Sequence, residues 1–172
     1  MKKLWRTLGE KSGMTLLEAV LAMTLLVVIV SACGGLIVSS MRAATGAMRS
    51  VEASAAGWAV VDHISEELRY ATAVDVGGSG NNSIRVSGNK LEKLHNGSYM
   101  TVYDLSGFPN FELALDITQL DRNRITFRVD VLETSGETLF SGECPVSFLN
   151  NPKVRFGGDL PVRNPEIFYS VK

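Results

Sequence analysis

The chain is poor in cysteine and histidine, the residue types on which disulfide scaffolds and most zinc sites depend. Its 172 residues contain two cysteines and two histidines. Cys33 lies in an apolar run near the N-terminus and Cys144 lies far along the chain, so we expect no intramolecular disulfide. His63 and His95 stand in unrelated patterns and predict no zinc site. The folded domain must therefore be held together by packing, and we expect no bound metal.

The sequence also lacks a catalytic or cofactor motif. The glycine-rich stretch 77–82 has neither the spacing of a dinucleotide fingerprint nor a following Lys-Ser/Thr pair, so it predicts a flexible turn. Acids and bases are nearly balanced, with a net charge of −1, which gives no indication of a nucleic-acid partner. Asp62, Glu66 and Glu67, with Arg69 nearby, are interpreted as a solvated helix face. We therefore expect no enzymatic activity and no cofactor.

What the sequence does contain is a long apolar segment after a basic leader. From Ala19 to Met41 there is no charged residue, and a helix rising ~1.5 Å per residue would span roughly 34 Å over this stretch, enough to cross a bilayer. After the segment come Arg42 and Arg49. The basic residues before it are Lys2, Lys3, Arg6 and Lys11. The excess of basic residues before the apolar segment predicts an N-terminus in the cytoplasm and the remainder of the chain outside.

Glu18 is the one acid at the edge of this apolar segment. Thr15 followed three residues later by Glu18 fits the capping box that starts many helices. Capping does not explain why an apolar run of bilayer length follows a basic leader that ends in Gly13. The stretch Lys11–Ser40, KSGMTLLEAVLAMTLLVVIVSACGGLIVSS, resembles the N-terminus of type IV pilins and of type II secretion pseudopilins.

The resemblance implies a set of processing and assembly steps. A prepilin peptidase would cut between Gly13 and Met14, and Met14, which replaces the family's usual phenylalanine, would become the N-methylated first residue. Glu18 would then be the fifth mature residue, and its carboxylate would meet the Met14 amine of a neighbouring subunit, so that each compensates the other's charge. Thr15 and Glu18 are assigned to subunit assembly. The implied partners are the peptidase, sister pilin or pseudopilin subunits and an inner-membrane assembly platform.

The same resemblance implies a structural role, as a minor pilin or pseudopilin. We expect a single-pass protein of the inner membrane that later enters an extracellular or periplasmic filament. A different interpretation takes the basic residues as a signal sequence and Val30-Ser31-Ala32-Cys33 as a lipobox, so that Cys33 is lipidated and anchors an extracytoplasmic binding domain. The apolar stretch 36–38 after Cys33 counts against it, because lipoproteins usually have a polar tether there. A plain signal anchor is the third alternative.

The sequence divides into a leader at 1–13, a transmembrane and assembly helix at 14–40, and a domain at 41–172 that begins with an amphipathic helix. Gly34-Gly35, a costly pair inside a helix, indicates either helix flexibility or close helix packing. Apolar residues at spacings of three and four predict the buried face of the amphipathic helix. These residues are Met41, Ala44, Met48, Val51, Ala55, Trp58, Val61, Ile64 and Leu68.

After Tyr70 the pattern changes to short alternating runs divided by turn residues, which predicts an antiparallel sheet. Asn96-Gly97 is a strong signal for a two-residue hairpin turn, and further turns are expected at 88–89, 121–123 and 135–136. The predicted strands are Ser83–Ser87, Lys90–His95, Ser98–Leu105, Phe111–Leu120, Arg124–Glu133, Thr138–Leu149 and Ile167–Val171. The expected fold class is α+β, a long N-terminal helix packed on an antiparallel sheet, and the resemblance implies that it is pilin-like.

Overall fold

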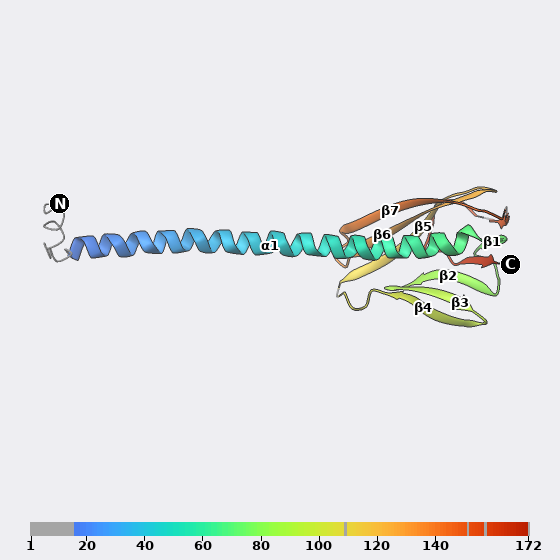
Figure 1. Ribbon diagram of the computed structural model, residues 1–172, viewed down its shortest axis with the longest axis horizontal. Helices are drawn as coiled ribbons and strands as arrows, with labels where there is room; N and C mark the ends of the chain where they lie inside the picture. Colours follow the sequence, from blue (N-terminus) through green and yellow to red (C-terminus); the bar gives the residue numbers. More distant parts are fainter. Residues whose placement is uncertain (1–15, 109, 151, 157, 172) are drawn as a thin grey trace, which may run out of the picture. The chain divides into compact units, whose positions relative to one another are not determined.

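The computed structural model describes residues 16–108, 110–150, 152–156 and 158–171, which form one helix followed by ten strands (Figure 1). The helix is α1, Leu16–Arg69. The strands are β1 Ala73–Val76, β2 Asn82–Ser87, β3 Lys90–His95, β4 Ser98–Asp104, β5 Phe111–Leu120, β6 Arg124–Glu133, β7 Thr138–Ser147, β8 Lys153–Arg155, β9 Val162–Arg163 and β10 Ile167–Ser170. Gly13, Met14 and Thr15 lie outside the described residues.

The chain forms two compact units, Met1–Gly46 and Ala47–Lys172. Residues 16–46 of α1 belong to the first unit, and residues 47–69 together with the strands belong to the second, which we call the head. The prediction of one long helix is confirmed, and α1 continues through Gly34 and Gly35 without a break. No other part of the described chain lies within 4 Å of a Cβ built on either glycine. Flexibility at this pair stays a prediction.

The C-terminal end of α1 is closed by hydrogen bonds from the following segments. Ala71 N–H donates to the Leu68 carbonyl at 3.1 Å, which tightens the last turn. Leu149 N–H donates to the Arg69 carbonyl at 2.9 Å, and Asn150 Nδ2 donates to the Tyr70 carbonyl at 2.7 Å. A helix end leaves its last carbonyl groups without intrahelical partners, and these bonds supply them. The helix therefore ends where the chain connects to β1 and where the segment that follows β7 forms hydrogen bonds with it.

The head contains two sheets, which corrects the prediction of a single antiparallel sheet. Six strands follow the order β4-β3-β2-β10-β1-β8, and four follow the order β7-β6-β5-β9. Consecutive strands form the meanders β2 to β4 and β5 to β7, whereas β10 lies between β2 and β1, and β8 runs parallel to β1. The short strands β1, β8 and β9 depend on pairing between distant segments, which alternation of residue types does not reveal. The α+β class itself is confirmed.

The hairpins lie where the turn residues predict them. Asn96 and Gly97 have φ angles of 52° and 79°, the left-handed backbone that a two-residue type I′ turn requires. Gly136, with a φ of 91°, lies in the turn between β6 and β7. The predicted strand bounds agree with the observed ones to within about two residues at each end. Turn chemistry and alternation therefore determine the local structure of both meanders.

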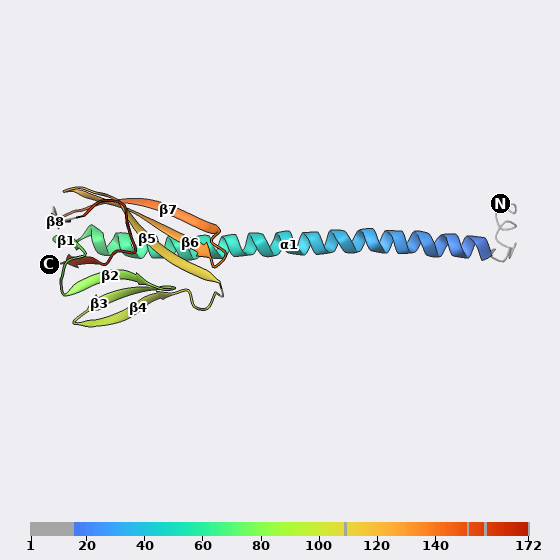
Figure 2. The ribbon, with the colours of Figure 1, turned by 180° about the vertical axis from the view of Figure 1, so that it is seen from behind.

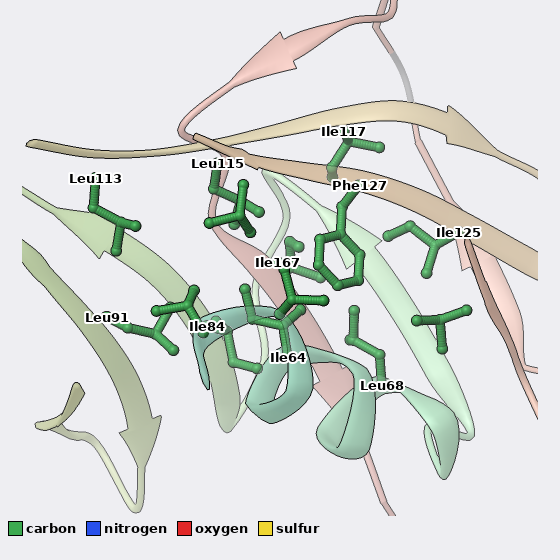
Figure 3. Packing of buried hydrophobic residues seen from close by; sticks show 14 of the residues in the cluster. Ile64, Leu68, Ile84, Leu91, Leu113, Leu115, Ile117, Ile125, Phe127 and Ile167 are labelled. Carbon is green, nitrogen blue, oxygen red and sulfur yellow. The ribbon is translucent and has the colours of Figure 1, made fainter. Parts of the chain in front are cut away.

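The helix and both sheets share one hydrophobic core. Figure 3 shows Ile64 and Leu68 of α1 pointing toward Leu115 and Phe127 of the four-stranded sheet and toward Ile84 of the six-stranded sheet. All five side chains are buried. Burying a Leu, Ile or Phe side chain stabilises a fold by roughly 1.5 to 3 kcal/mol, so this cluster is what holds α1 against the sheets in the absence of a disulfide.

The predicted buried face of α1 is right only near its end. Val61, Ile64 and Leu68 are buried as predicted, but Trp58 is 52% exposed and Met48 is 66% exposed. The remaining residues of the predicted face, Met41, Ala44, Val51 and Ala55, are exposed as well. In their place α1 buries Ala53, Ala56, Gly57 and Val60.

Small residues explain this difference, because they let α1 approach β7 closely. A Cβ built on Gly57 would lie 2.1 Å from Phe140 Cδ1, so only glycine leaves room for the Phe140 ring at that position. The prediction is wrong because it favours large apolar residues, whereas a close contact between a helix and a strand selects small ones.

Candidate functional site

Residues 16–46 of α1 present an apolar surface. The large apolar side chains are exposed, for example Leu16 at 86% and Ile29 at 52%. Within the part of the chain that the structure describes, α1 is the helix that is long and apolar enough to cross a membrane. An apolar surface of this extent is a liability in water but suits a lipid environment. The stretch is therefore compatible with a transmembrane helix or a signal anchor.

Most hydroxyl side chains in this stretch are satisfied within the helix. Thr24, Ser31, Ser39 and Thr45 each donate a hydrogen bond to a carbonyl one turn earlier in α1. The bonds run from Thr24 Oγ1 to the Leu21 carbonyl at 2.8 Å, from Ser31 Oγ to Val27 at 2.8 Å, from Ser39 Oγ to Leu36 at 3.0 Å and from Thr45 Oγ1 to Met41 at 2.8 Å. Because an unpaired hydroxyl is costly in hydrocarbon, these four bonds lower the cost of placing the stretch in an apolar environment.

Glu18 is the sole charged side chain in residues 16–41. It lies in the first turn of α1, where a carboxylate interacts favourably with the positive end of the helix dipole. This position suits a helix cap, and it also suits a contact with a cation near the N-terminus of a second subunit. The assembly role of Glu18 and the cleavage and methylation at Gly13 and Met14 stay predictions.

Cys33 and Cys144 are free thiols in different surroundings. Cys33 is exposed in the middle of the apolar stretch of α1. Cys144 is half-buried on β7, and its Sγ lies 3.4 Å from Ser65 Oγ of α1. A lipoprotein anchored at Cys33 would therefore lose residues 16–32 of a continuous helix, including Glu18.

Glu67 connects α1 to the six-stranded sheet, which corrects its interpretation as part of a solvated face. Its Oε1 accepts a hydrogen bond from Lys93 Nζ of β3, and its Oε2 accepts one from the Tyr169 hydroxyl of β10 at 2.7 Å. Burial raises the pKa of the Glu67 carboxyl, but the hydrogen bonds from Lys93 and Tyr169 outweigh burial, so the net shift is downward. Burial and the bond to Glu67 raise the pKa of Tyr169. Asp62 and Glu66 are exposed, as predicted.

The sequence carries a weak signal for this contact. Each residue rotates by about 100° around a helix, so Glu67 lies closer to the buried face than its neighbour Glu66 does. The bonds themselves require knowledge that β3 and β10 pass beside α1, which is a non-local property. The cluster of Glu67, Lys93 and Tyr169 is structural, because all its polar atoms serve to hold the helix on the sheet.

The described residues contain no group of three or more His, Cys, Asp or Glu side chains that could hold a metal ion. His63 lies on α1 with its Nε2 buried and without a hydrogen-bond partner among those residues. His95 Nδ1 lies 3.2 Å from Asn82 Oδ1 at the end of β3. The two histidines thus lie in different surroundings, one on α1 and one at the end of β3.

No family model matches this chain, and no curated protein and no solved structure shows significant similarity to it. Its function is therefore inferred from the apolar stretch of α1, from Glu18 and from the motif that precedes them.

Proposed function

We propose that the protein is a pilin-like structural subunit, held in the inner membrane by α1 and assembled, as a minor pilin or pseudopilin, into a type IV pilus or a type II secretion pseudopilus. The observation that carries the proposal is the exposed apolar stretch of α1, with Glu18 in its first turn, directly after the cleavage motif at Gly13-Met14. The internal hydrogen bonds of Thr24, Ser31, Ser39 and Thr45 support an apolar environment for this stretch.

The same helix surface would serve the subunit before and after assembly. In the membrane it contacts lipid, and in a filament it contacts the apolar helices of neighbouring subunits. Because both environments are apolar, the transfer leaves the hydroxyl groups bonded and requires little change in solvation.

Glu18 would favour the subunit in the filament over the subunit alone in the membrane. A carboxylate in an apolar zone is costly, and a countercharge offsets part of that cost. The α-amino group that cleavage creates at Met14 is such a countercharge when it belongs to a neighbouring subunit. The pair offsets the desolvation of both groups and fixes the register of one subunit against the next.

Mass spectrometry of the mature N-terminus after co-expression with a prepilin peptidase tests the proposal. We expect the chain to lose residues 1–13 and to begin with a methylated Met14. Gly13→Leu should block the cut, because it places a bulky side chain at the scissile bond. Gly46→Leu is a matched control on α1. A Cβ built on Gly46 meets no atom of the described chain beyond the local helix backbone within 4 Å, so this variant should be processed normally.

Two outcomes would contradict this proposal. One is a mature chain that begins at a lipidated Cys33, which is the lipoprotein alternative. The other is an uncut leader in the presence of an active peptidase, which would leave a signal anchor.

A further inference from the structure

A cavity of about 230 Å³ lies in the head at the β8 end of the six-stranded sheet. Figure 2 shows β8 beside β1 at this end. The cavity is bordered by Lys153 and Arg155 of β8, Asp75 of β1, Phe168 of β10, and Ser79 and Gly80 of the loop that follows β1. None of these residues belongs to the apolar stretch of α1 or to the processing motif.

Strand pairing places these side chains on one face of the six-stranded sheet, in two rows that run across β8, β1 and β10. Asp75 pairs with Arg155 on one side and with Phe168 on the other, and Ala73 pairs in the same way with Lys153 and Ser170. Successive residues of a strand point to opposite faces. Tyr169, between Phe168 and Ser170, faces α1, because its hydroxyl donates to Glu67. The two rows therefore face away from α1.

The loop after β1 forms the remaining wall of the cavity. Gly77, with a φ of +73°, starts the turn, and its N–H donates to the Glu166 carbonyl at 3.0 Å. A Cβ built on Gly78 would lie 2.3 Å from the carboxyl carbon of Asp75, so the loop backbone lies directly against that side chain. A Cβ built on Gly80 would lie 3.4 Å from the Phe168 ring carbon Cδ1. Glycine thus lets the loop close over the face while leaving space above the ring.

The charges that border the cavity are not neutralised by other described side chains. Lys153 and Arg155 are exposed, and neither forms an ion pair or a side-chain hydrogen bond with another residue that the structure describes. Lysine and arginine on a short edge strand also protect it from pairing with other chains. Edge protection requires the charges alone and explains neither the cavity nor the aromatic ring opposite them.

We propose that this cavity binds a small carboxylate attached to an apolar or aromatic body. The carboxylate lies between Lys153 and Arg155, where the guanidinium can donate two parallel hydrogen bonds to it. The apolar body lies on the Phe168 ring and on Ala73. Asp75 lies between Arg155 and Phe168 in its row, so its carboxylate repels negative charge near the ring and keeps the ligand's carboxylate at the β8 side. The volume is below the roughly 300 to 1,000 Å³ of sites for drug-sized ligands, so it admits a small free acid or the C-terminal residue of a polypeptide.

The test uses 3-phenylpropanoate as a probe and the full chain in a non-ionic detergent, with binding followed by saturation-transfer difference NMR of the probe's ring protons. We expect a dissociation constant on the order of 1 mM or tighter for so small a ligand. The neutral 3-phenylpropanamide has the same body without the charge, and it should bind at least tenfold more weakly. Equal binding of acid and amide would overturn the ionic part of the proposal.

Three variants separate the site from general surface charge. Lys153→Ala with Arg155→Ala should weaken binding of the probe by roughly tenfold or more. Arg122→Ala removes one positive charge from an exposed turn and should leave binding unchanged. Asp75→Asn removes the repelling carboxylate and should tighten binding, an effect opposite to that of lost folding. Unchanged affinity in the double variant, or no probe signal with the wild-type chain, would overturn the proposal.

A peptide probe identifies the source of the carboxylate. Gly-Gly-Gly-Phe with a free C-terminus has the same phenyl group and carboxylate on a peptide chain. If it binds more tightly than 3-phenylpropanoate, the ligand is a polypeptide C-terminus, and if it is excluded while the free acid binds, the ligand is a small acid. Either result supports the site, whereas binding of neither probe refutes it.

Discussion

Gly57→Ala tests the contact between α1 and β7. A Cβ built on Gly57 would lie 2.1 Å from Phe140 Cδ1 and 2.2 Å from Cε1. Phe140 has little room to move, because a Cβ built on Gly142 would lie 2.6 Å from its Cζ, and because Trp58 packs edge-on against the ring with a centroid distance of 5.4 Å. The extra methyl group therefore overpacks this contact.

Two effects of opposite sign compete in this variant. Alanine stabilises a helix interior relative to glycine by up to ~1 kcal/mol. Overpacking a well-packed core costs ~1 to 3 kcal/mol. Several ring atoms would lie closer than 3 Å, so we expect overpacking to dominate with a net loss of ~1 to 2 kcal/mol, which lowers the melting temperature by on the order of 5 °C.

Thermal unfolding of the full chain in a non-ionic detergent, followed by near-UV circular dichroism, measures this loss through the aromatic residues of the head. Gly46→Ala is the matched control, because it makes the same change in α1 where a Cβ meets no atom of the described chain beyond the local helix backbone within 4 Å, and it should not lower the melting temperature. Phe140→Leu combined with Gly57→Ala should recover part of the loss. A Gly57→Ala chain as stable as Gly46→Ala would refute the close packing of α1 on β7.

Two further predictions concern the helix and its contacts in the head. Trp58→Ala should cost ~1 to 2 kcal/mol rather than the ~3 to 5 kcal/mol of a buried aromatic, because the side chain is 52% exposed; a loss above ~3 kcal/mol in urea unfolding would place Trp58 in the core. The Glu67 carboxyl has a folded pKa below its ordinary 4.5, so its stabilising contribution is present above ~pH 4.5 and is lost as the pH falls through the folded pKa. Glu67→Gln should remove this acid-side loss and cost ~1 to 3 kcal/mol at pH 7, whereas Glu66→Gln should change stability by less than ~0.5 kcal/mol. A pH profile of unfolding that Glu67→Gln leaves unchanged would contradict the role of this carboxyl.

The parts of the fold that follow local rules could be predicted from the sequence. The Asn96-Gly97 turn needs two left-handed residues in a row, which these two residues adopt readily, so the hairpin of β3 and β4 is visible in the sequence. Clean alternation in β6 marks the buried face correctly, whereas the other face is mostly half-buried and includes the buried Thr126. The partition into two sheets could not be predicted, because β10 lies between β1 and β2 through pairing of residues far apart in the chain.

The candidate site also combines features that the sequence predicts with features that it does not. The length and composition of the apolar stretch predict a helix that can cross a membrane, and α1 has that length and composition. The orientation of the helix in the head could not be predicted from apolar periodicity, because Gly57 is buried in close contact with Phe140 of β7. The prediction that Glu67 belongs to a solvated face is wrong for a related reason, since its partners Lys93 and Tyr169 come from strands distant in sequence.

Glu18→Gln tests the proposal at its centre, where a helix cap and a subunit contact predict different outcomes. If the carboxylate only caps its own helix, the change should cost no more than ~1 kcal/mol, because glutamine also serves in a capping box. If it neutralises the Met14 amine of a neighbouring subunit, glutamine leaves a cation in apolar surroundings, and assembly should fail while the leader is still cut. The measurement compares processed monomer in membranes with subunit in sheared filaments for the wild type, Glu18→Gln and the control Glu66→Gln. We expect Glu18→Gln to be fully processed and missing from the filaments, and normal incorporation of this variant would contradict the pairing and leave Glu18 as a helix cap.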